Sequence, residues 1–191
     1  MSKEVIKRAT QGDRSAQKLV LYECSDLVRG FLFRLVGSMA DLDDLQQTVY
    51  LRLLIGLKHL RQEAALSSWV GSICVNVVRD FWRQRKTRGF VSSEDYMQEK
   101  VVDPQNLQQR LEAREALAKC HRVLGKLSVN HRIAFVLRAM GHCVDDIATM
   151  MNAGRSTTRL RLYWARKAFA RGMTEEVNAC VSYGEEVNNN D

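Results

Sequence analysis

Apolar residues recur every three or four positions along most of the chain, which is the spacing of one face of an α-helix. The clearest stripe consists of Val70, Ile73, Cys74, Val77, Val78 and Phe81. Strict alternation of apolar and polar positions, typical of strands, is scarce, and the sequence contains a single proline. The pattern therefore predicts an all-α protein.

Residues that start and stop helices punctuate this periodicity. Gly12 and Asp13 are typical of the end of a first helix and the start of a second. Gly37 is expected to end the second helix, Asp41 to begin a third, and Ser128 to begin one in the C-terminal half. Helices are thus expected from the first residues onward.

The helical pattern fails between residues 89 and 104, where the sequence reads "GFVSSEDYMQEKVVDP". This stretch is polar, acidic and prone to turns. We therefore expect two small helical domains, residues 1–88 and 105–171, joined by a flexible acidic linker at residues 89–104. The acidic residues 172–191 are expected to be a disordered tail. An alternative is that this tail folds over a basic module and screens it.

Charge divides the chain in the same places. The net charge of +7 is the balance of +6 in residues 1–89, −3 in 90–118, +9 in 119–171 and −5 in 172–191. Two basic blocks separated by an acidic segment indicate two modules that face nucleic acid. Ordinary basic helix surfaces are a weaker explanation, because residues 119–171 hold eleven cations and only two anions.

Other classes of protein find little support in the sequence. No apolar run reaches the ~18 residues that a membrane span needs, so a soluble, cytoplasmic protein without membrane insertion is expected. Phosphate-binding loops, dinucleotide turns and catalytic pairs in motif context are missing, which indicates that the chain is not an enzyme and needs no cofactor.

The cysteines and histidines do not form a recognisable metal site. The five cysteines are Cys24, Cys74, Cys120, Cys143 and Cys180, scattered and without a C-x-x-C pair. Free core thiols fit this spacing better than a disulfide framework or a zinc site. His142 beside Cys143, with His131 and Cys120 nearby, raises a metal-sensing alternative, but no metal ligand set is predicted.

The segment 144–170 has the spacing of a helix-turn-helix. "VDDIATMM" predicts a short helix, the turn follows at Asn152, and "RSTTRLRLYWARKAFA" predicts the second helix. Helical spacing places Thr158, Leu162, Ala165 and Phe169 on the inward face. It places Arg155, Arg159, Tyr163 and Arg166 on the outward face, where a second helix would meet a major groove.

A second polar face lies behind the apolar stripe of residues 70–81. It consists of Trp69, Ser72, Asn76, Arg79, Arg83 and Lys86, which are three or four residues apart. An aromatic ring, an amide and several cations on one helix face can stack a base, read its edge and hold phosphate. Phe81 is assigned to the core and Trp82 to its boundary. For Lys86 and Arg88 a solvated face is an equally good explanation.

Four segments together resemble the extracytoplasmic-function sigma factors of bacterial RNA polymerase, in the sigma-70 family. They are "GDRSA" (12–16), "DLDDLQQTVYLRL" (41–53), "SSWVGSICVNVVRDFWRQRKTR" (67–88) and "LSVNHRIAFVLRAMGHCVDDIATMMNAGRSTTRLRLYWARKAF" (127–169). The resemblance implies a first domain that binds core RNA polymerase and opens the −10 promoter element. It implies a second domain that reads the −35 element of promoter DNA.

The resemblance, together with the faces described above, gives three sets of site residues. The core polymerase set is Asp41, Asp44, Leu45, Gln47, Val49 and Leu53. The −10 single-strand set is Trp69, Asn76, Arg79, Arg83, Arg85 and Lys86. The −35 set is Arg155, Ser156, Arg159, Leu160, Arg161, Tyr163 and Arg166. An anti-sigma factor is a further expected partner.

The chain also departs from the family's pattern. Thr48 stands where an acidic residue usually follows the glutamine of the polymerase-binding segment, and Ala153 stands where a bulky aliphatic residue is usual in the turn. The departures in the second helix bear on which promoter is read. The alternative function is a free-standing helix-turn-helix regulator that acts without polymerase.

Overall fold

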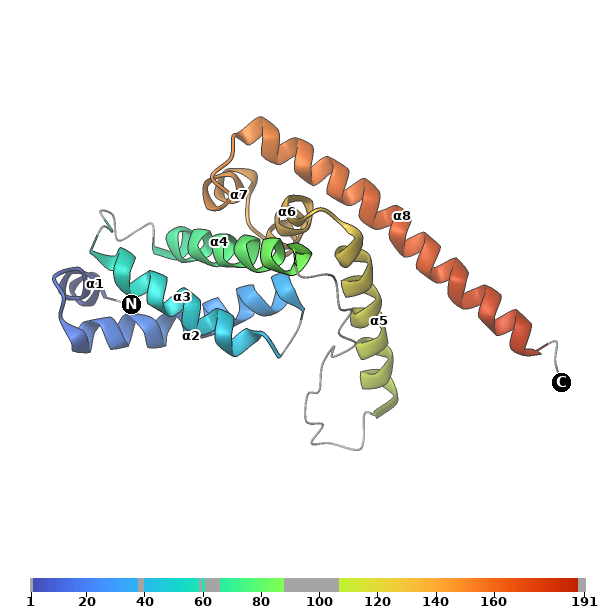
Figure 1. Ribbon diagram of the computed structural model, residues 1–191, viewed down its shortest axis with the longest axis horizontal. Coiled ribbons are helices and arrows are strands. Elements are labelled where there is room, and N and C mark those ends of the chain that lie inside the picture. The colour runs from blue at the N-terminus through green and yellow to red at the C-terminus, as the bar shows by residue number, and fades with distance from the viewer. Residues whose placement is uncertain (1, 38–39, 59, 61–65, 88–106, 189–191) are drawn as a thin grey trace.

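The computed structural model describes residues 2–37, 40–58, 60, 66–87 and 107–188 of the chain (Figure 1). All secondary structure in these ranges is helical, which confirms the all-α prediction. The N-terminal helices are α1 Lys3–Thr10, α2 Arg14–Val36, α3 Leu42–Leu57 and α4 Leu66–Thr87. The C-terminal helices are α5 Leu107–Lys126, α6 Val129–Ala139, α7 Val144–Met150 and α8 Arg155–Asn188.

Asp13 caps the start of α2 as its sequence position predicted. Its Oδ1 accepts hydrogen bonds from the backbone N–H groups of Ser15 and Ala16, at 2.9 and 3.1 Å. Its Oδ2 accepts from the guanidinium of Arg8. The Ala16 amide and Arg8 lower the pKa of the Asp13 carboxyl below its usual value, because both favour the ionised form.

Three other predicted boundaries agree with the structure. Gly37 ends α2 in the left-handed conformation, with φ 77°, which a residue without Cβ adopts freely. The Ser128 hydroxyl accepts from the backbone N–H of His131 at the start of α6. Asn152 has φ 46° in the turn between α7 and α8, where the sequence predicted a sharp bend.

Helix α4 lies at the centre of the molecule. Figure 1 shows α2 and α3 on one side of it and α6 and α7 on the other, and the packing of these helices agrees. The apolar stripe of α4 is buried, from Val70 to Val78. Together with Phe31 and Leu35 of α2 and Leu53 of α3 it forms the core of the N-terminal helices.

The C-terminal helices pack directly on the N-terminal ones. Gly71 of α4 is buried, and a Cβ built on it would lie 2.9 Å from the sulfur of Met150 in α7. Because that contact is so close, α4 and α7 approach through a glycine. The buried cluster is continuous across the two helix groups. The division into two domains stays a prediction, and the predicted linker lies outside the described residues.

Helix α8 continues to Asn188, into the segment that was expected to be a disordered tail, and the disorder of that tail stays a prediction. Glu176 of this extension pairs with Arg122 and Lys126 of α5, with N–O distances of 3.4 and 3.3 Å. Gly172 is buried against the side chain of Val123. The sequence after Arg155 contains no proline, so nothing ends the helix once α5 supplies a packing surface.

Candidate nucleic-acid interface

The N-terminal half of α8 presents most of its predicted −35 residues to solvent. The exposed residues are Arg155, Ser156, Arg159, Leu160, Tyr163 and Arg166. Leu160 and Tyr163 are more than half exposed. This face can place cations, a hydroxyl and an apolar tip against the edges and phosphates of duplex DNA.

Packing on the opposite side of α8 fixes the direction of this face. Thr158, Leu162 and Ala165 are buried, and Phe169 packs against the core, as the helical spacing predicted. The Thr158 hydroxyl donates to the carbonyl oxygen of Gly154 at 3.1 Å.

An ion pair also joins the first turn of α7 to the first residue of α8. The guanidinium of Arg155 lies 3.1 Å from the carboxylate of Asp145, at the start of α7. Both side chains are largely exposed, so the pair orients Arg155 but contributes little stability.

Arg161 is a correction to the −35 set. Its side chain is half-buried, and its Nη1 atom is buried without a hydrogen-bond partner among the described residues. Burial lowers the pKa of Arg79 in α4, and the positive charge of Arg161 lowers it further. Arg161 entered the −35 set through the family resemblance, and helical spacing had not placed it on the outward face.

Arg79 of the −10 set lies at the junction between α4 and the C-terminal helices. Its Nη2 donates to the carbonyl oxygen of Met151 at 3.0 Å, and its Nε donates to the side-chain oxygen of Asn130 at 3.2 Å. Its Nη1 lies 3.4 Å from the side-chain oxygen of Asn76, which is exposed beside it. Asn76 and Arg79 are therefore adjacent, as predicted, but Arg79 is engaged by the protein itself.

Two further cations of the −10 set also contact neighbouring side chains. Arg83 reaches Asp80 at 2.9 Å, and Asp80 in turn accepts from Arg52 of α3 at 2.8 Å. Arg85 pairs with Asp41 at 3.2 Å. Arg83 keeps most of its side chain in solvent, whereas Arg85 is mostly covered.

Trp69 does not stand free on the −10 face. A Cβ on Gly56 of α3 would lie 2.6 Å from its indole ring, so the ring packs against the bare backbone of α3. It is partly buried against the core. Trp69 therefore joins α3 to α4, which corrects its expected role as a freely presented stacking ring. The side chain of Lys86 lies outside the described residues.

Arg132 is a structural residue that the sequence did not indicate. It is 6% exposed, and its Nε and Nη2 donate to the carbonyl oxygens of Leu124 and Gly125, each at 2.8 Å. Its guanidinium also lies over the ring of Trp82, 4.2 Å from the centroid. Trp82, expected at the core boundary, thus contacts α6, and Phe81 packs against the core as predicted.

The polymerase set needs a correction as well. Leu45, Val49 and Leu53 are buried, at 8%, 0% and 0% exposure, so their side chains hold α3 in the core and cannot meet a partner. Asp44 and Gln47 are exposed as a surface role requires.

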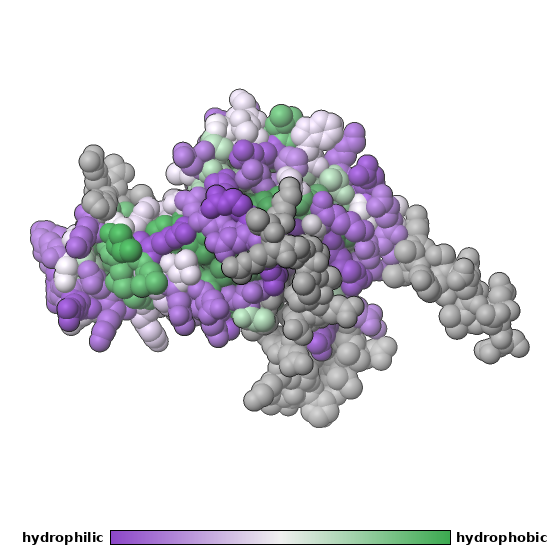
Figure 2. Space-filling model, viewed as in Figure 1, coloured by the Kyte–Doolittle hydropathy of each residue, from purple (hydrophilic) through white to green (hydrophobic). Residues whose placement is uncertain are grey.

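Two large apolar side chains of α3, Leu51 and Ile55, are exposed, at 62% and 72%. The sequence analysis did not identify them. Figure 2 shows an apolar area over the end of α3 on a mostly hydrophilic face. Leu51 and Ile55 lie off the apolar stripe of α3, and this position was the signal in the sequence that could have identified them.

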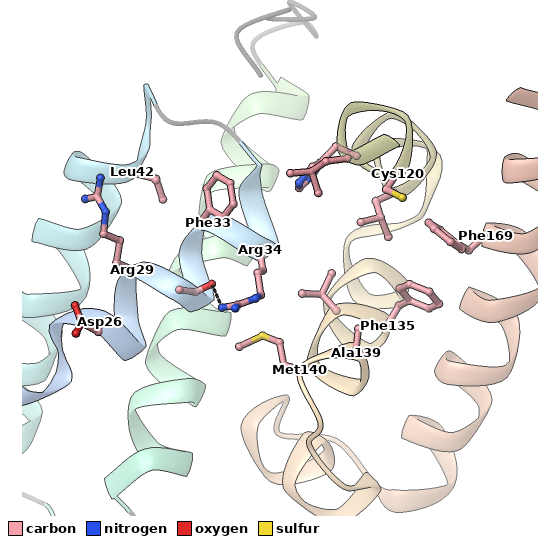
Figure 3. Close-up of a pocket in the computed structure, with 15 residues that line it drawn as sticks. Asp26, Arg29, Phe33, Arg34, Leu42, Cys120, Phe135, Ala139, Met140 and Phe169 are labelled. Atoms are coloured by element: carbon pink, nitrogen blue, oxygen red, sulfur yellow. Dashed lines mark hydrogen bonds between the residues drawn. The ribbon is translucent and has the colours of Figure 1, made fainter. Parts of the chain in front are cut away.

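A hollow of about 650 Å³ lies between α2 and the C-terminal helices (Figure 3). Its walls are mainly apolar, with Phe33 on one side and Phe135 and Phe169 on the other, as Figure 3 shows. Arg34 lies at its edge, where its Nη1 donates to the carbonyl oxygen of Gly30 at 3.1 Å. Such a hollow suits an apolar side chain or helix better than a charged ligand.

Burial shifts the pKa values of two titratable groups in the described core. Burial raises the pKa of the Cys74 thiol to about 12, so this thiol is a core residue that does not ionise. Burial, and to a smaller extent Arg132, lowers the pKa of His121, which packs against Phe33.

The described part of the chain contains neither a candidate metal site nor a candidate membrane span. No cluster of three or more metal-ligating side chains was found there. Within the same residues, no helix is both long and apolar enough to cross a membrane.

Comparison with known proteins shows what this chain is similar to. The family model for sigma-70 region 2 matches residues 21–88. The chain is 24% identical to the RNA polymerase sigma-H factor of Pseudomonas aeruginosa over 178 residues, which cover 89% of this chain and 92% of that protein. It is 25% identical to the ECF RNA polymerase sigma-E factor of Escherichia coli K12 over 175 residues, covering 86% and 90%.

Two solved structures share the fold. One is CnrH in complex with the cytosolic domain of CnrY, with a TM-score of 0.58 and 19% identity over 87% of this chain and 93% of that one. The other is the sigma factor RpoE with the anti-sigma factor NepR from Bartonella quintana. It has a TM-score of 0.62 and 20% identity over 82% and 96%.

Proposed function

We propose that the chain is an extracytoplasmic-function sigma factor of the sigma-70 family, which directs core RNA polymerase to promoters and starts transcription there. The observation that carries the proposal is the extent of the match. The curated relatives align over about nine tenths of both chains, so the likeness includes the C-terminal helices as well as α2–α4. A free-standing helix-turn-helix regulator does not account for this extent.

In this proposal the exposed face of α8 reads duplex DNA at the −35 element. Arg159 and Tyr163 point away from the buried Thr158–Ala165 side, which supports their contact with a major groove. Ser156 and Leu160 share that face and are suited to base edges and thymine methyl groups. Arg161 is left out of this set because its side chain is half-buried.

The polar face of α4 holds the non-template strand of the opened −10 element. Asn76 is exposed and reads a base edge, and Arg83 supplies charge for the phosphates. Flipping a base costs a few kcal/mol, which stacking and backbone contacts offset. Because Arg79 is bonded to Met151 in the packed arrangement, the C-terminal helices must move away before Arg79 contacts DNA.

Core polymerase binds the outer face of α3. We assign this contact to Asp44 and Gln47 together with Leu51 and Ile55, because these side chains are exposed on one helix. Two exposed apolar side chains beside charged and polar ones are typical of a protein contact surface. The buried leucines and valine of the core polymerase set pack α3 against the core.

An anti-sigma factor is the expected regulator, and an apolar helix of it would enter the hollow between α2 and α5, α6 and α8. The apolar walls of Phe33, Phe135 and Phe169 support this assignment. The proposed function places the protein in the cytoplasm with polymerase. The sigma factors are not catalysts, and we assign the chemistry of RNA synthesis to polymerase alone.

Co-purification with core polymerase followed by run-off transcription tests the proposal. We expect a stable complex and a promoter-dependent transcript. A protein that binds duplex DNA tightly by itself but never supports initiation would contradict the proposal and favour the free-standing regulator.

Two substitutions separate the roles of the two helix faces. Arg159→Ala is expected to weaken binding to −35 duplex, whereas Asn76→Ala leaves that binding intact and reduces strand opening, measured by permanganate reactivity of unpaired thymines. Arg171→Ala, an exposed cation at the far end of the basic part of α8, serves as the matched control. Equal effects of Asn76→Ala and Arg159→Ala on duplex binding would show that the two-face assignment is wrong.

A further inference from the structure

The hollow between α2 and the C-terminal helices is lined by apolar side chains that remain only partly buried. Phe33 of α2 lies on one side of it, and Phe135 of α6 and Phe169 of α8 lie on the other (Figure 3). Phe135 and Phe169 pack on each other, with ring centroids 4.6 Å apart. Apolar surface in contact with water is unfavourable, so an apolar ligand that displaces this water would be stabilised in the hollow.

The size of the hollow fits a small molecule. Its volume of about 650 Å³ lies within the roughly 300–1,000 Å³ of small-molecule pockets. Residues of α2, α5, α6 and α8 line it, so a ligand would be held from several sides. Met140 of α6 is among them, and a methionine side chain adapts to ligands of different shape.

Arg34 supplies a positive charge at the edge of the hollow. Its Nη1 donates to the carbonyl oxygen of Gly30 in the same helix, and that bond leaves Nε and Nη2 for another acceptor. Among the described residues, no carboxylate forms an ion pair with Arg34. Arg29, which also lines the hollow, is paired with Asp43 at 3.2 Å. Asp26 lines the hollow two helical turns from Arg34, about 12 Å along α2, so it does not neutralise that charge.

His121 lines the hollow from α5 without adding a charge at neutral pH. Its ring packs against Phe33, with centroids 6.4 Å apart. Burial, and to a smaller extent Arg132, lowers the pKa of His121, so the ring stays neutral at pH 7. Recognition of an anionic group at neutral pH therefore depends on Arg34.

We propose that this hollow binds a small amphiphile, an apolar body that carries one carboxylate. The apolar body lies between Phe33 and the Phe135–Phe169 pair, and the carboxylate accepts charge-assisted hydrogen bonds from Arg34. The proposal does not rest on the proposed role in transcription. A bound ligand would exclude an anti-sigma helix from the same hollow, because both need the same apolar walls.

Isothermal titration of the full-length chain with decanoate, below the concentration at which decanoate forms micelles, tests the site. We expect saturable binding of decanoate. We expect weaker binding of decanol, which has the same apolar chain without the charge. No saturable binding of decanoate, or equal affinity for the two ligands, would overturn the proposal.

A substitution of Arg34 tests the recognition of the carboxylate. Arg34→Gln is expected to weaken decanoate binding by about tenfold or more, since charged hydrogen bonds are lost, and to leave decanol binding unchanged. Lys18→Gln removes an exposed cation of the same helix outside the hollow and is the matched control, with unchanged affinity for both ligands. Equal losses of decanoate binding in the two variants would mean a general charge effect and would contradict the assignment of Arg34.

A substitution that fills the hollow tests where the ligand binds. Ala139 lines the hollow at the end of α6 and is exposed, so Ala139→Trp places an indole ring there without disturbing the core. We expect this variant to lose binding of both ligands while its helicity, measured by circular dichroism, is retained. Ala170→Trp, at an exposed position of α8 outside the lining residues, is expected to bind like wild type. Undiminished binding by Ala139→Trp, or equal losses in the two tryptophan variants, would show that the ligand does not occupy the hollow.

Discussion

Arg132 gives the sharpest test of how the C-terminal helices are held together. Replacing it with alanine removes two hydrogen bonds of 2.8 Å, to the carbonyl oxygens of Leu124 and Gly125, and a guanidinium 4.2 Å from the ring centre of Trp82. Hydrogen bonds to charged groups contribute about 1.5–3 kcal/mol each. A desolvated cation–π contact contributes up to about 2 kcal/mol.

The loss of stability in Arg132→Ala is expected to be smaller than the sum of these contributions. The Leu124 carbonyl also accepts from the backbone N–H of Leu127, at 3.1 Å, and Gly125 is exposed, so neither oxygen is left unpaired. We therefore expect Arg132→Ala to lower the free energy of unfolding by about 2–4 kcal/mol. Urea denaturation followed by circular dichroism measures this loss.

Three further variants test whether the loss of stability comes from the contacts of Arg132. Arg132→Lys keeps the charge but not the planar fork, so an intermediate loss is expected. Arg138→Ala, on the exposed side of the same helix, is expected to cost less than about 1 kcal/mol. A double-mutant cycle with Trp82→Leu should give a coupling of about 1–2 kcal/mol. A loss below about 1 kcal/mol for Arg132→Ala would refute the reasoning.

Three more predictions follow from the helix ends and the surface of α3. Asp13→Ala should lower stability at neutral pH. Because the carboxyl has a lowered pKa in the folded state, the difference from wild type should shrink as pH falls below about 4, in thermal unfolding across pH. Truncation after Gly172 should reduce the helical signal at 222 nm, whereas an unchanged total signal would mean that the removed segment was not helical. Leu51→Glu with Ile55→Glu should leave the unfolding free energy within about 0.5 kcal/mol of wild type and weaken polymerase binding in a pull-down. Leu53→Ala, the buried control on the same helix, should instead cost about 2–5 kcal/mol, and a stable Leu53→Ala protein would contradict the assigned burial.

Local sequence was sufficient for most helix boundaries, because the interactions that set them join residues close in the chain. Asp13 caps the helix that follows it, Gly37 adopts the left-handed conformation that ends it, and Asn152 bends the turn before α8. The inward face of α8 was also predictable, since Thr158 and Ala165 follow the helical repeat. The resemblance of whole segments to a known family then gave the function.

The roles of individual cations depended on which helix packs against which. Arg159 and Arg161 are two residues apart on one helix, yet one is exposed and the other is half-buried. Arg79 bonds to the carbonyl oxygen of Met151, 72 residues further along the chain, and no periodicity records such a contact. Arg132 lies within an apolar helix and is buried because carbonyl groups and an indole ring happen to surround it.

The sequence by itself therefore determined the helices and their caps, because a helix is specified by residues within a few positions of one another. Only the tertiary structure decided which side of α3 is available to a partner, that α8 extends along α5, and that Arg79 bonds to the C-terminal helices. Burial and charge at these places depend on neighbours distant in the chain. A pattern along a single helix shows that one of its faces is covered, but it does not identify the element that covers it.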